Sequence, residues 1–250
     1  MDAAPEPERL DIHNSEIPVL CRSCEARHRG ICGALTPVEL TQLSRHTVKQ
    51  KVESDRELVS AGEEVKHYSN VLSGVVKLTR LMADGRQQIV GLQFAPDFVG
   101  RPFRRSSEVS AEAATEVKLC SFPKQAMDDM IAASPDLERR LYQQALEELD
   151  EAREWILTLG RKTAAEKVAS FLLMIAENVD PDGIAGGRPI RFELPLKRAD
   201  IADFLGLTIE TVSRQITKLR KAGVILVEHN RTVTVPSLSR LRERCEVDAG

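Results

Sequence analysis

Residues 208–219 read Thr-Ile-Glu-Thr-Val-Ser-Arg-Gln-Ile-Thr-Lys-Leu, and their spacing predicts an amphipathic helix. Val212, Ile216 and Leu219 recur at intervals of four and three, so they share one apolar side that would face a core. Thr208 is suited to cap the first turn, because its hydroxyl can accept a hydrogen bond from a free backbone amide. We therefore expect a short, surface-lying helix with one buried face.

A second, shorter helix is expected just before it, at residues 198–205 (RADIADFL). Gly206 would supply the tight turn between the two helices, and Gly223 would end the second one. Two helices joined by such a turn predict a helix-turn-helix, whose second helix enters the DNA major groove. The alternative is an ordinary amphipathic helix with a solvated polar face.

The exposed face of the second helix carries side chains that suit base and phosphate contacts. Arginine bonds bidentately to guanine, glutamate accepts from cytosine, and lysine and hydroxyl side chains contact phosphate or adapt to several bases. The residues expected to contact DNA are Thr208, Glu210, Ser213, Arg214, Thr217 and Lys218.

The residues after this helix favour DNA binding. Arg220 and Lys221 add positive charge for phosphates, and residues 224–235 read as a hairpin with its turn at 229–231, the wing of a winged helix. Net charge is −3 for the whole chain, but residues 161–250 hold 15 basic against 12 acidic side chains, so the charge there is +3. A local basic surface on an acidic protein would limit nonspecific DNA binding.

Three cysteines near the start of the chain, Cys21, Cys24 and Cys32, have the spacing C-x2-C-x7-C. Clustered cysteines in a protein of a reducing compartment more often bind metal than form disulfides. Three thiolates with a distant fourth suit a [4Fe–4S] cluster or a zinc site, and His28 is an additional candidate ligand. From spacing alone, iron–sulfur, zinc and unliganded thiols all remain open.

Residues 48–121 have the pattern of a β-domain. Short apolar or alternating runs at 57–60, 68–72, 75–81, 88–94 and 117–122 are separated by glycines, and Asp84-Gly85 is typical of a hairpin turn. Many short strands indicate a sandwich or roll. Upstream, Thr36 and Pro37 are expected to begin a short helix.

Residues 196–225, LKRADIADFLGLTIETVSRQITKLRKAGVI, resemble the DNA-binding helices of the CRP/FNR superfamily of bacterial transcription regulators. Glu210, Ser213 and Arg214 form an E-x-x-S-R core similar to that of the FNR branch. The resemblance implies that these three residues read a two-fold-symmetric site with TTGAT-type half sites. It also implies a β-roll sensory domain related to cyclic-nucleotide-binding domains. Lys197 departs from the Thr or Ser usual at the start of the first helix.

The same resemblance favours one of the three alternatives for the cysteines, namely iron–sulfur, zinc or unliganded thiols. Oxygen-sensing members of the FNR branch carry a cysteine cluster at this place and a fourth cysteine in the roll, a position that Cys120 matches. It implies a [4Fe–4S] cluster on Cys21, Cys24, Cys32 and Cys120, with spacing similar to FnrL-type members. The alternative is a zinc- or thiol-redox-controlled regulator. Cys245 matches nothing in the pattern.

Cyclic nucleotide binding is not expected. Members of the superfamily that bind cyclic AMP place Glu after the glycine of the phosphate loop, whereas here Gly100 is followed by Arg101. Arg105-Ser106 follows too soon to complete that motif. The simplest interpretation of Arg101, Arg104 and Arg105 is solvated surface charge.

A long helix is expected from Ser134-Pro135 to Leu159, ending at Gly160. Near-heptad apolar spacing predicts a parallel dimer, which paired half sites also require. The expected seam residues are Leu141, Ala145, Leu149, Ala152, Ile156 and Leu159. Acidic side chains beside the seam would repel their copies, so Asp150 and Glu154 are expected to make the dimer conditional on an intact cluster.

We therefore expect an α+β protein with four regions: an arm and cysteine loop at 1–34, a β-roll at 35–133, a dimerisation helix at 134–160 and a winged helix at 161–250. Activation would require contact with RNA polymerase, for which the resemblance nominates Asp84 and Gly85. No run is long enough to span a membrane and no export signal is evident, so we expect a cytoplasmic homodimer. The β-domain offers only His67 for a histidine metal site, and catalytic motifs are lacking, so an enzyme is not expected.

Overall fold

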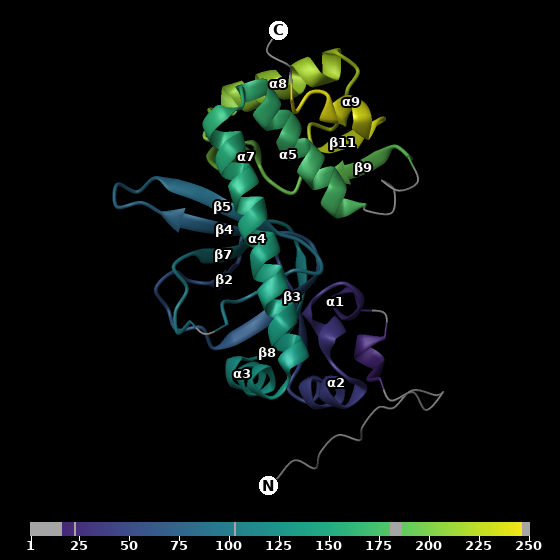
Figure 1. Cartoon of the computed structure of the whole chain (residues 1–250). Coiled ribbons are helices and arrows are strands. Elements are labelled where there is room, and N and C mark those ends of the chain that lie inside the picture. Colours follow the sequence, from purple (N-terminus) through teal and green to yellow (C-terminus); the bar gives the residue numbers. More distant parts are fainter. Residues whose placement is uncertain (1–16, 23, 103, 181–186, 247–250) are drawn as a thin grey trace.

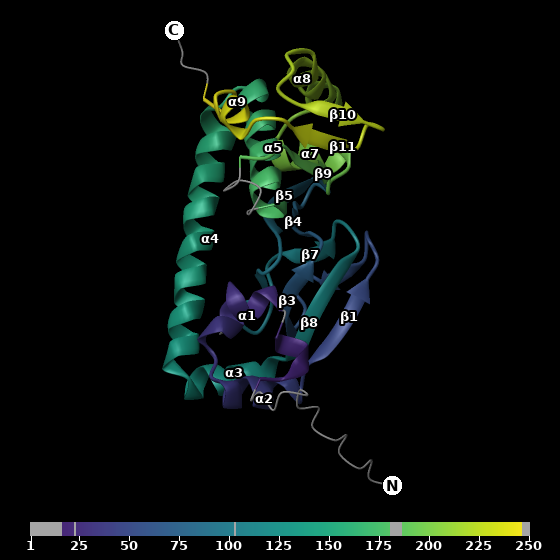
Figure 2. The same cartoon turned by 90° about the vertical axis from the view of Figure 1, so that its right-hand side faces the viewer.

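The computed structural model describes residues 17–22, 24–102, 104–180 and 187–246. A β-domain lies at one end and a group of helices with a small sheet lies at the other (Figure 1). A single long helix runs along one side of the molecule and connects the two (Figure 2). Residues 1–16, most of the arm expected at the start of the chain, are outside the described ranges.

Two four-stranded sheets build the β-domain, in the orders β1-β8-β3-β6 and β2-β7-β4-β5. Valine, leucine and alanine side chains of both sheets, among them Val71, Val76 and Leu119, fill the space between them. This arrangement confirms the expected roll. The strands are β1 (Val48–Val52), β2 (Glu57–Val59), β3 (His67–Ser73), β4 (Val76–Leu81), β5 (Gln87–Gln93), β6 (Phe98–Val99), β7 (Ser110–Ala113) and β8 (Val117–Pro123).

Three of these strands, β1, β6 and β7, were not among the expected runs. Four of the five residues of β1 are exposed, so it shows no apolar alternation. Strand β6 has two residues and β7 has four, which is too short for a periodic signal. Pairing with β8, β3 and β4 decides their conformation.

Short helices cover the outer face of the β1-β8-β3-β6 sheet. They are η1 (Val19–Cys21), α1 (Glu25–His28), η2 (Ile31–Ala34), α2 (Pro37–Ser44) and α3 (Lys124–Ala133). Tyr68 and Phe122 of the sheet are buried against this layer together with Met127 of α3. The expected start of α2 is confirmed, since Thr36 and Glu39 form a reciprocal capping box before Pro37.

The long helix α4 (Pro135–Arg161) begins where expected, with proline in its first turn. It passes through Gly160 instead of ending there, and its last turn is closed by a hydrogen bond from the Lys162 amide to the Thr158 carbonyl. Ser134 precedes the helix without a side-chain capping bond. A single glycine is tolerated in a helix when the backbone groups of the following turn are hydrogen-bonded.

The C-terminal part has the expected winged-helix order. Helix α5 (Ala164–Val179) precedes β9 (Ile190–Glu193), α7 (Arg198–Leu205), α8 (Ile209–Lys221), β10 (Leu226–Glu228), β11 (Thr232–Val235) and α9 (Leu238–Arg242). The three strands form a sheet in the order β10-β11-β9. Val224 and Ile225, expected to begin the wing strand, are instead buried in the core before it.

The core of this domain continues into the roll. Val75, Ile89 and Phe94 of the roll belong to the same buried cluster as the side chains of α5, α7 and α8. Trp155 of α4 packs against Phe204 of α7, with ring centroids 4.6 Å apart and ring planes tilted by 57°. The DNA-binding domain therefore rests on the β4-β5 hairpin and on α4.

Candidate functional site

Helix α8 buries the apolar side that its sequence predicts. Val212, Ile216 and Leu219 are buried. Thr208 caps the helix, because its Oγ1 accepts a hydrogen bond from the Thr211 amide at 3.2 Å. Gly206 turns the chain between α7 and α8 with φ of 61°, a left-handed conformation that glycine adopts at little cost.

The polar face of α8 points away from the core. Glu210, Ser213, Arg214 and Lys218 are exposed, so their side chains are free to reach a groove. Thr217 is half-buried, and its hydroxyl donates to the Ser213 carbonyl at 2.9 Å. This face forms a single surface with the basic last turn of the helix.

The wing is held to the first helix of the pair. Arg198 of α7 donates from Nη2 to the carbonyl of Asn230 at 3.2 Å, and His229 and Asn230 have positive φ in the turn. Sequence inspection assigned no role to Arg198. Its position at the helix start gives no hint of a partner 32 residues away.

The four cysteines expected to bind a cluster line one cavity. Cys21 comes from η1, Cys24 from the turn before α1, Cys32 from η2, and Cys120 from the middle of β8. Cys32 is buried and the other three are partly buried, and none forms a disulfide. The fold thus brings Cys120 together with cysteines that are 88 to 99 positions before it in the sequence. Cys245 is buried elsewhere, where its thiol contacts the Leu241 carbonyl.

The thiols of Cys120 and Cys32 are expected to be protonated when no metal is bound. Burial, reinforced by the neighbouring Cys24 and Cys21, raises the pKa of Cys120 to about 12. Burial also raises the pKa of Cys32 far above its usual range, with Cys120 adding to the effect. Metal binding at this cavity would therefore release protons, and its strength would depend on pH.

Two polar residues flank Cys120 across the sheet. Lys49 of β1 and Asn70 of β3 both lie directly opposite Cys120, one on each side. Both residues also line the cysteine cavity. Sequence inspection missed them, because only strand register places them beside a cysteine.

Four cysteine thiols are the donor set that a [4Fe–4S] cluster uses. A [4Fe–4S] cluster takes one thiolate on each iron, so its four ligands surround the cluster without converging on a single point. Within the described residues, no group of three or more His, Cys, Asp or Glu side chains is arranged to hold a single metal ion. His28 is exposed, and its Nε2 lies 3.0 Å from the Arg22 carbonyl.

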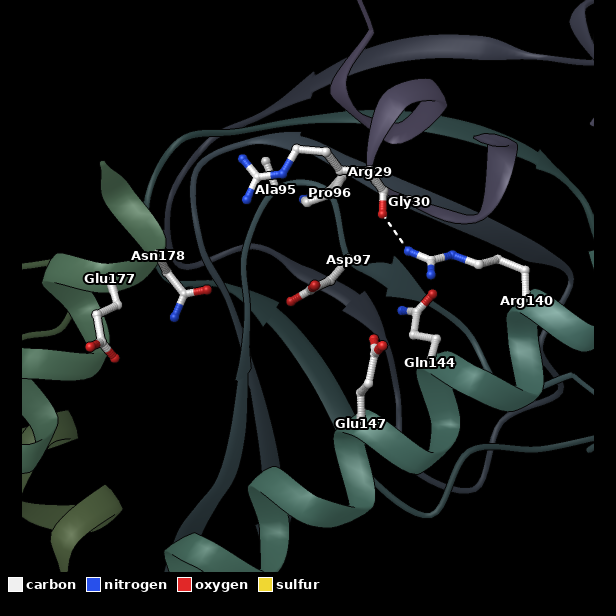
Figure 3. Close-up of a pocket in the computed structure, with 10 residues that line it drawn as sticks. All are labelled: Arg29, Gly30, Ala95, Pro96, Asp97, Arg140, Gln144, Glu147, Glu177 and Asn178. Carbon is white, nitrogen blue, oxygen red and sulfur yellow. Dashed lines mark hydrogen bonds between the residues drawn. The ribbon is translucent and has the colours of Figure 1, made fainter. Parts of the chain in front are cut away.

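The cysteine loop also contacts the long helix. Arg140 of α4 donates from Nη2 to the Arg29 carbonyl at 2.6 Å. Gly30 lies so close to the β5–β6 turn that a Cβ there would be 2.9 Å from the Pro96 carbonyl oxygen. Figure 3 shows Gly30 and Pro96 on one side of a pocket and Arg140, Gln144 and Glu147 of α4 on the other.

Asp97 lies in the same pocket, between the turn and the helix (Figure 3). Burial raises the pKa of its carboxyl to about 6, although a hydrogen bond from the Phe94 amide acts in the opposite direction. Glu151 and Glu148 of α4 raise the pKa further. The carboxyl groups of Asp97, Glu148 and Glu151 therefore influence one another where the roll faces the helix.

One outer face of α4 is apolar and largely exposed in the described part of the chain. Of the expected seam, Ala145, Leu149, Ala152 and Ile156 are exposed, and Leu159 is half-buried. Leu141 was also expected in the seam, but it is buried in the core of its own chain and lies outside this exposed face. Tyr142, Leu146 and Leu157 add exposed apolar surface that the prediction omitted.

The acidic residues expected beside the seam are also exposed on α4. Asp150 forms an ion pair with Arg153 of the same helix at 2.9 Å. No ion pair is found for Glu154 within the described part of the chain. The two carboxylates therefore differ in how far their charge is compensated.

The tip of the β4-β5 hairpin projects from the roll beside the DNA-binding domain (Figure 1). Asp84 accepts hydrogen bonds from the backbone and side chain of Arg86, and Gly85 has φ of 86°. Leu81 and Met82 are exposed at the same tip. The surface nominated for polymerase contact is therefore accessible.

The loop after β6 carries the arginines interpreted as surface charge. Arg101, Arg104 and Arg105 are all exposed. The backbone carbonyl of Arg101 accepts a hydrogen bond from the Tyr68 hydroxyl at 3.4 Å. Their exposure agrees with solvated charges, and the expectation that no cyclic nucleotide binds stays a prediction.

Comparisons with known proteins identify both domains. Residues 166–244 match the Crp-like helix-turn-helix domain, and residues 49–134 match the cyclic nucleotide-binding domain. A probable transcriptional activator of Rhizobium leguminosarum bv. viciae is 54% identical over 237 residues, covering 93% of this chain and 98% of that protein. The transcriptional activator protein FnrL of Cereibacter sphaeroides is 38% identical, covering 94% of this chain and 96% of FnrL.

The structure of FixK2 from Bradyrhizobium japonicum is similar, with a TM-score of 0.71 and 29% identity, covering 81% of this chain and 99% of FixK2. No helix in the described ranges is both long enough and apolar enough to cross a membrane. These relatives are transcription regulators and not enzymes. With both of its domains and nearly its whole length matched, the chain belongs to the Crp/FNR family of DNA-binding transcription regulators.

Proposed function

We propose that this protein is an oxygen-responsive activator of anaerobic gene expression whose Cys21, Cys24, Cys32 and Cys120 hold a [4Fe–4S] cluster. The observation that carries the proposal is the shared cavity, in which three loop cysteines meet a cysteine from a distant strand. The similarity to FnrL supports it. A cluster bound at this site would supply a group that oxygen can attack, and it would link the three loop cysteines to Cys120.

The cysteine loop is placed to influence dimerisation. It is joined to α4 by the Arg140–Arg29 hydrogen bond, and its Gly30 packs closely on the β5–β6 turn of the roll. An ordered loop holds α4 so that its exposed apolar face can pair with a second copy of the chain. Acidic side chains near that face oppose pairing, which leaves the balance sensitive to the loop.

A dimer would place two α8 helices on a palindromic promoter. We infer that Glu210, Ser213 and Arg214 read TTGAT-type half sites, while Thr208, Thr217 and Lys218 contribute to positioning. The β4-β5 tip at Asp84 and Gly85 would contact RNA polymerase. This function places the protein in the cytoplasm, where promoter DNA and polymerase are found. Because binding is reciprocal, DNA should in turn stabilise the dimer.

The decisive test is anaerobic purification followed by iron and acid-labile sulfide assays and visible spectroscopy as air is admitted. We expect about four irons and four sulfides per chain, and an absorption band that bleaches in air together with loss of DNA binding. Cys120→Ser should abolish the band, whereas Cys245→Ser, which replaces a buried cysteine outside the cavity, should keep it. Zinc or free thiols in place of iron would contradict the oxygen mechanism and leave DNA binding intact.

A further inference from the structure

We propose that Asn70 is a positioning residue for the iron–sulfur site, holding Cys32 as a thiolate ligand through a hydrogen bond from its side-chain amide. The inference rests on the proposed function, since it concerns a ligand of the same cluster. It adds a protein group outside the four cysteines that would control how firmly the cluster is retained.

The geometry of the contact is direct. Asn70 Nδ2 lies 3.3 Å from Cys32 Sγ, within hydrogen-bonding distance for sulfur, and the Asn70 side chain is fully buried. Asn70 stands opposite Cys120 in the β3–β8 pairing, and residues that are paired in this way place their side chains on the same face of a sheet. One side chain of the roll thus lies beside two of the four expected ligands.

Cys32 is the most deeply placed of the four expected ligands. It is buried, whereas Cys21, Cys24 and Cys120 are only partly buried. The side-chain amide of Asn70 is placed to donate a hydrogen bond to its sulfur. A buried thiolate requires a donor, because water cannot reach it.

Packing alone does not account for an asparagine at this position. Asn70 Oδ1 is buried without a hydrogen-bond partner in the described structure, which costs stability that an apolar residue would not incur. Tyr68 and Phe122, which are also buried in this region, are aromatic. An amide therefore stands at a position where a leucine of similar shape would suit the core.

The experiment compares three full-length proteins loaded with cluster under anaerobic conditions: wild type, Asn70→Leu and Gln93→Leu. Gln93 is the matched control. It is also buried in the roll, donates from Nε2 to the Phe98 carbonyl at 3.0 Å, and leaves its Oε1 without a partner, but it does not line the cysteine cavity. Each variant loses a buried side-chain amide, but only Asn70→Leu loses a hydrogen-bond donor to a cysteine sulfur.

The first readout is the rate of iron loss to a ferrous chelator without oxygen. Residues that support metal ligands change metal affinity by about 10- to 100-fold, so Asn70→Leu should lose iron at least about tenfold faster than wild type. Two further readouts would not respond to a merely structural role. The iron–thiolate stretching bands should shift, and the midpoint potential should become more negative, because a hydrogen bond to sulfur stabilises the reduced cluster.

Gln93→Leu should match wild type in all three measurements. If Asn70→Leu also matches wild type in iron loss, vibrational bands and potential, the inference is wrong while the proposed function stands. A wild-type protein that holds no iron or sulfide overturns both. Asn70→Ala provides a second variant without the donor should the leucine prevent folding, with circular dichroism as the check.

Discussion

Lys77 Nζ lies 3.4 Å from Asp200 Oδ1 and 2.8 Å from Glu112 Oε1, so a buried lysine of the roll is shared with the first helix of the helix-turn-helix. The lysine side chain is 6% exposed, which removes most of the screening by water. Burial alone would lower the pKa of Lys77, but the hydrogen bonds and charges of Glu112 and Asp200 outweigh it and raise the pKa. The sensory and DNA-binding domains are thus joined by a charged contact as well as by a shared core.

Replacing Lys77 with methionine should weaken this domain contact. The substitution leaves two partly buried carboxylates facing each other, and removing one partner of a buried ion pair costs about 3–5 kcal/mol. Because Glu112 and Asp200 retain some exposure, we expect about 2–3 kcal/mol, measured by urea unfolding. Lys51→Met removes the exposed Lys51–Glu116 pair and should change stability little. Equal effects of the two substitutions would contradict the buried role of Lys77.

Asp97 should make stability depend on pH. Its folded pKa of about 6 lies above the unfolded value of 3.8, so the folded state holds the proton more tightly. Stability is therefore highest below the unfolded pKa and declines as pH rises to about 6, by roughly 2–3 kcal/mol. Asp97→Asn should be more stable than wild type at pH 7.5, with the difference disappearing near pH 4. A constant difference across this range in thermal unfolding would contradict the assignment.

The DNA-facing residues should separate into two classes. Arg214→Ala removes a side chain expected to bond a guanine, so it should cost about 1–3 kcal/mol and relax specificity at one base pair. Lys218→Ala should weaken binding to all sequences and reduce the slope of log affinity against log salt by about 1. Binding titrations on matched and single-mismatch palindromes at several salt concentrations distinguish these outcomes. An identical specificity profile for the two variants would be inconsistent with the proposed roles.

The acidic residues of α4 should control dimerisation unequally. Glu154→Ala removes a charge for which the described structure shows no ion pair, so it should favour a dimer in air without a cluster. Asp150→Ala should have a smaller effect, because Arg153 already offsets the Asp150 charge. Analytical ultracentrifugation of the metal-free variants provides the measurement. If Glu154→Ala remains as monomeric as wild type, repulsion at this position does not govern the dimer.

Several features were predictable because they depend on neighbours in sequence. The α8 helix, its Thr208 cap and the Gly206 turn follow from helical periodicity and local backbone chemistry, and all three are present in the structure. The seam on α4 was only partly predictable. Spacing identifies a helix face, but it cannot tell which end of that face the chain's own core covers, and Leu141 is covered.

Short-range periodicity, capping and spacing encode the helix-turn-helix, the order of the domains and the loop with three cysteines. The surroundings of those cysteines depend instead on tertiary contacts. Strand register sets Lys49 and Asn70 on either side of Cys120, and the packing of the loop brings Cys32 to Asn70. Contacts between residues 38 to 71 positions apart arise from sheet pairing and loop packing, for which no local sequence pattern exists.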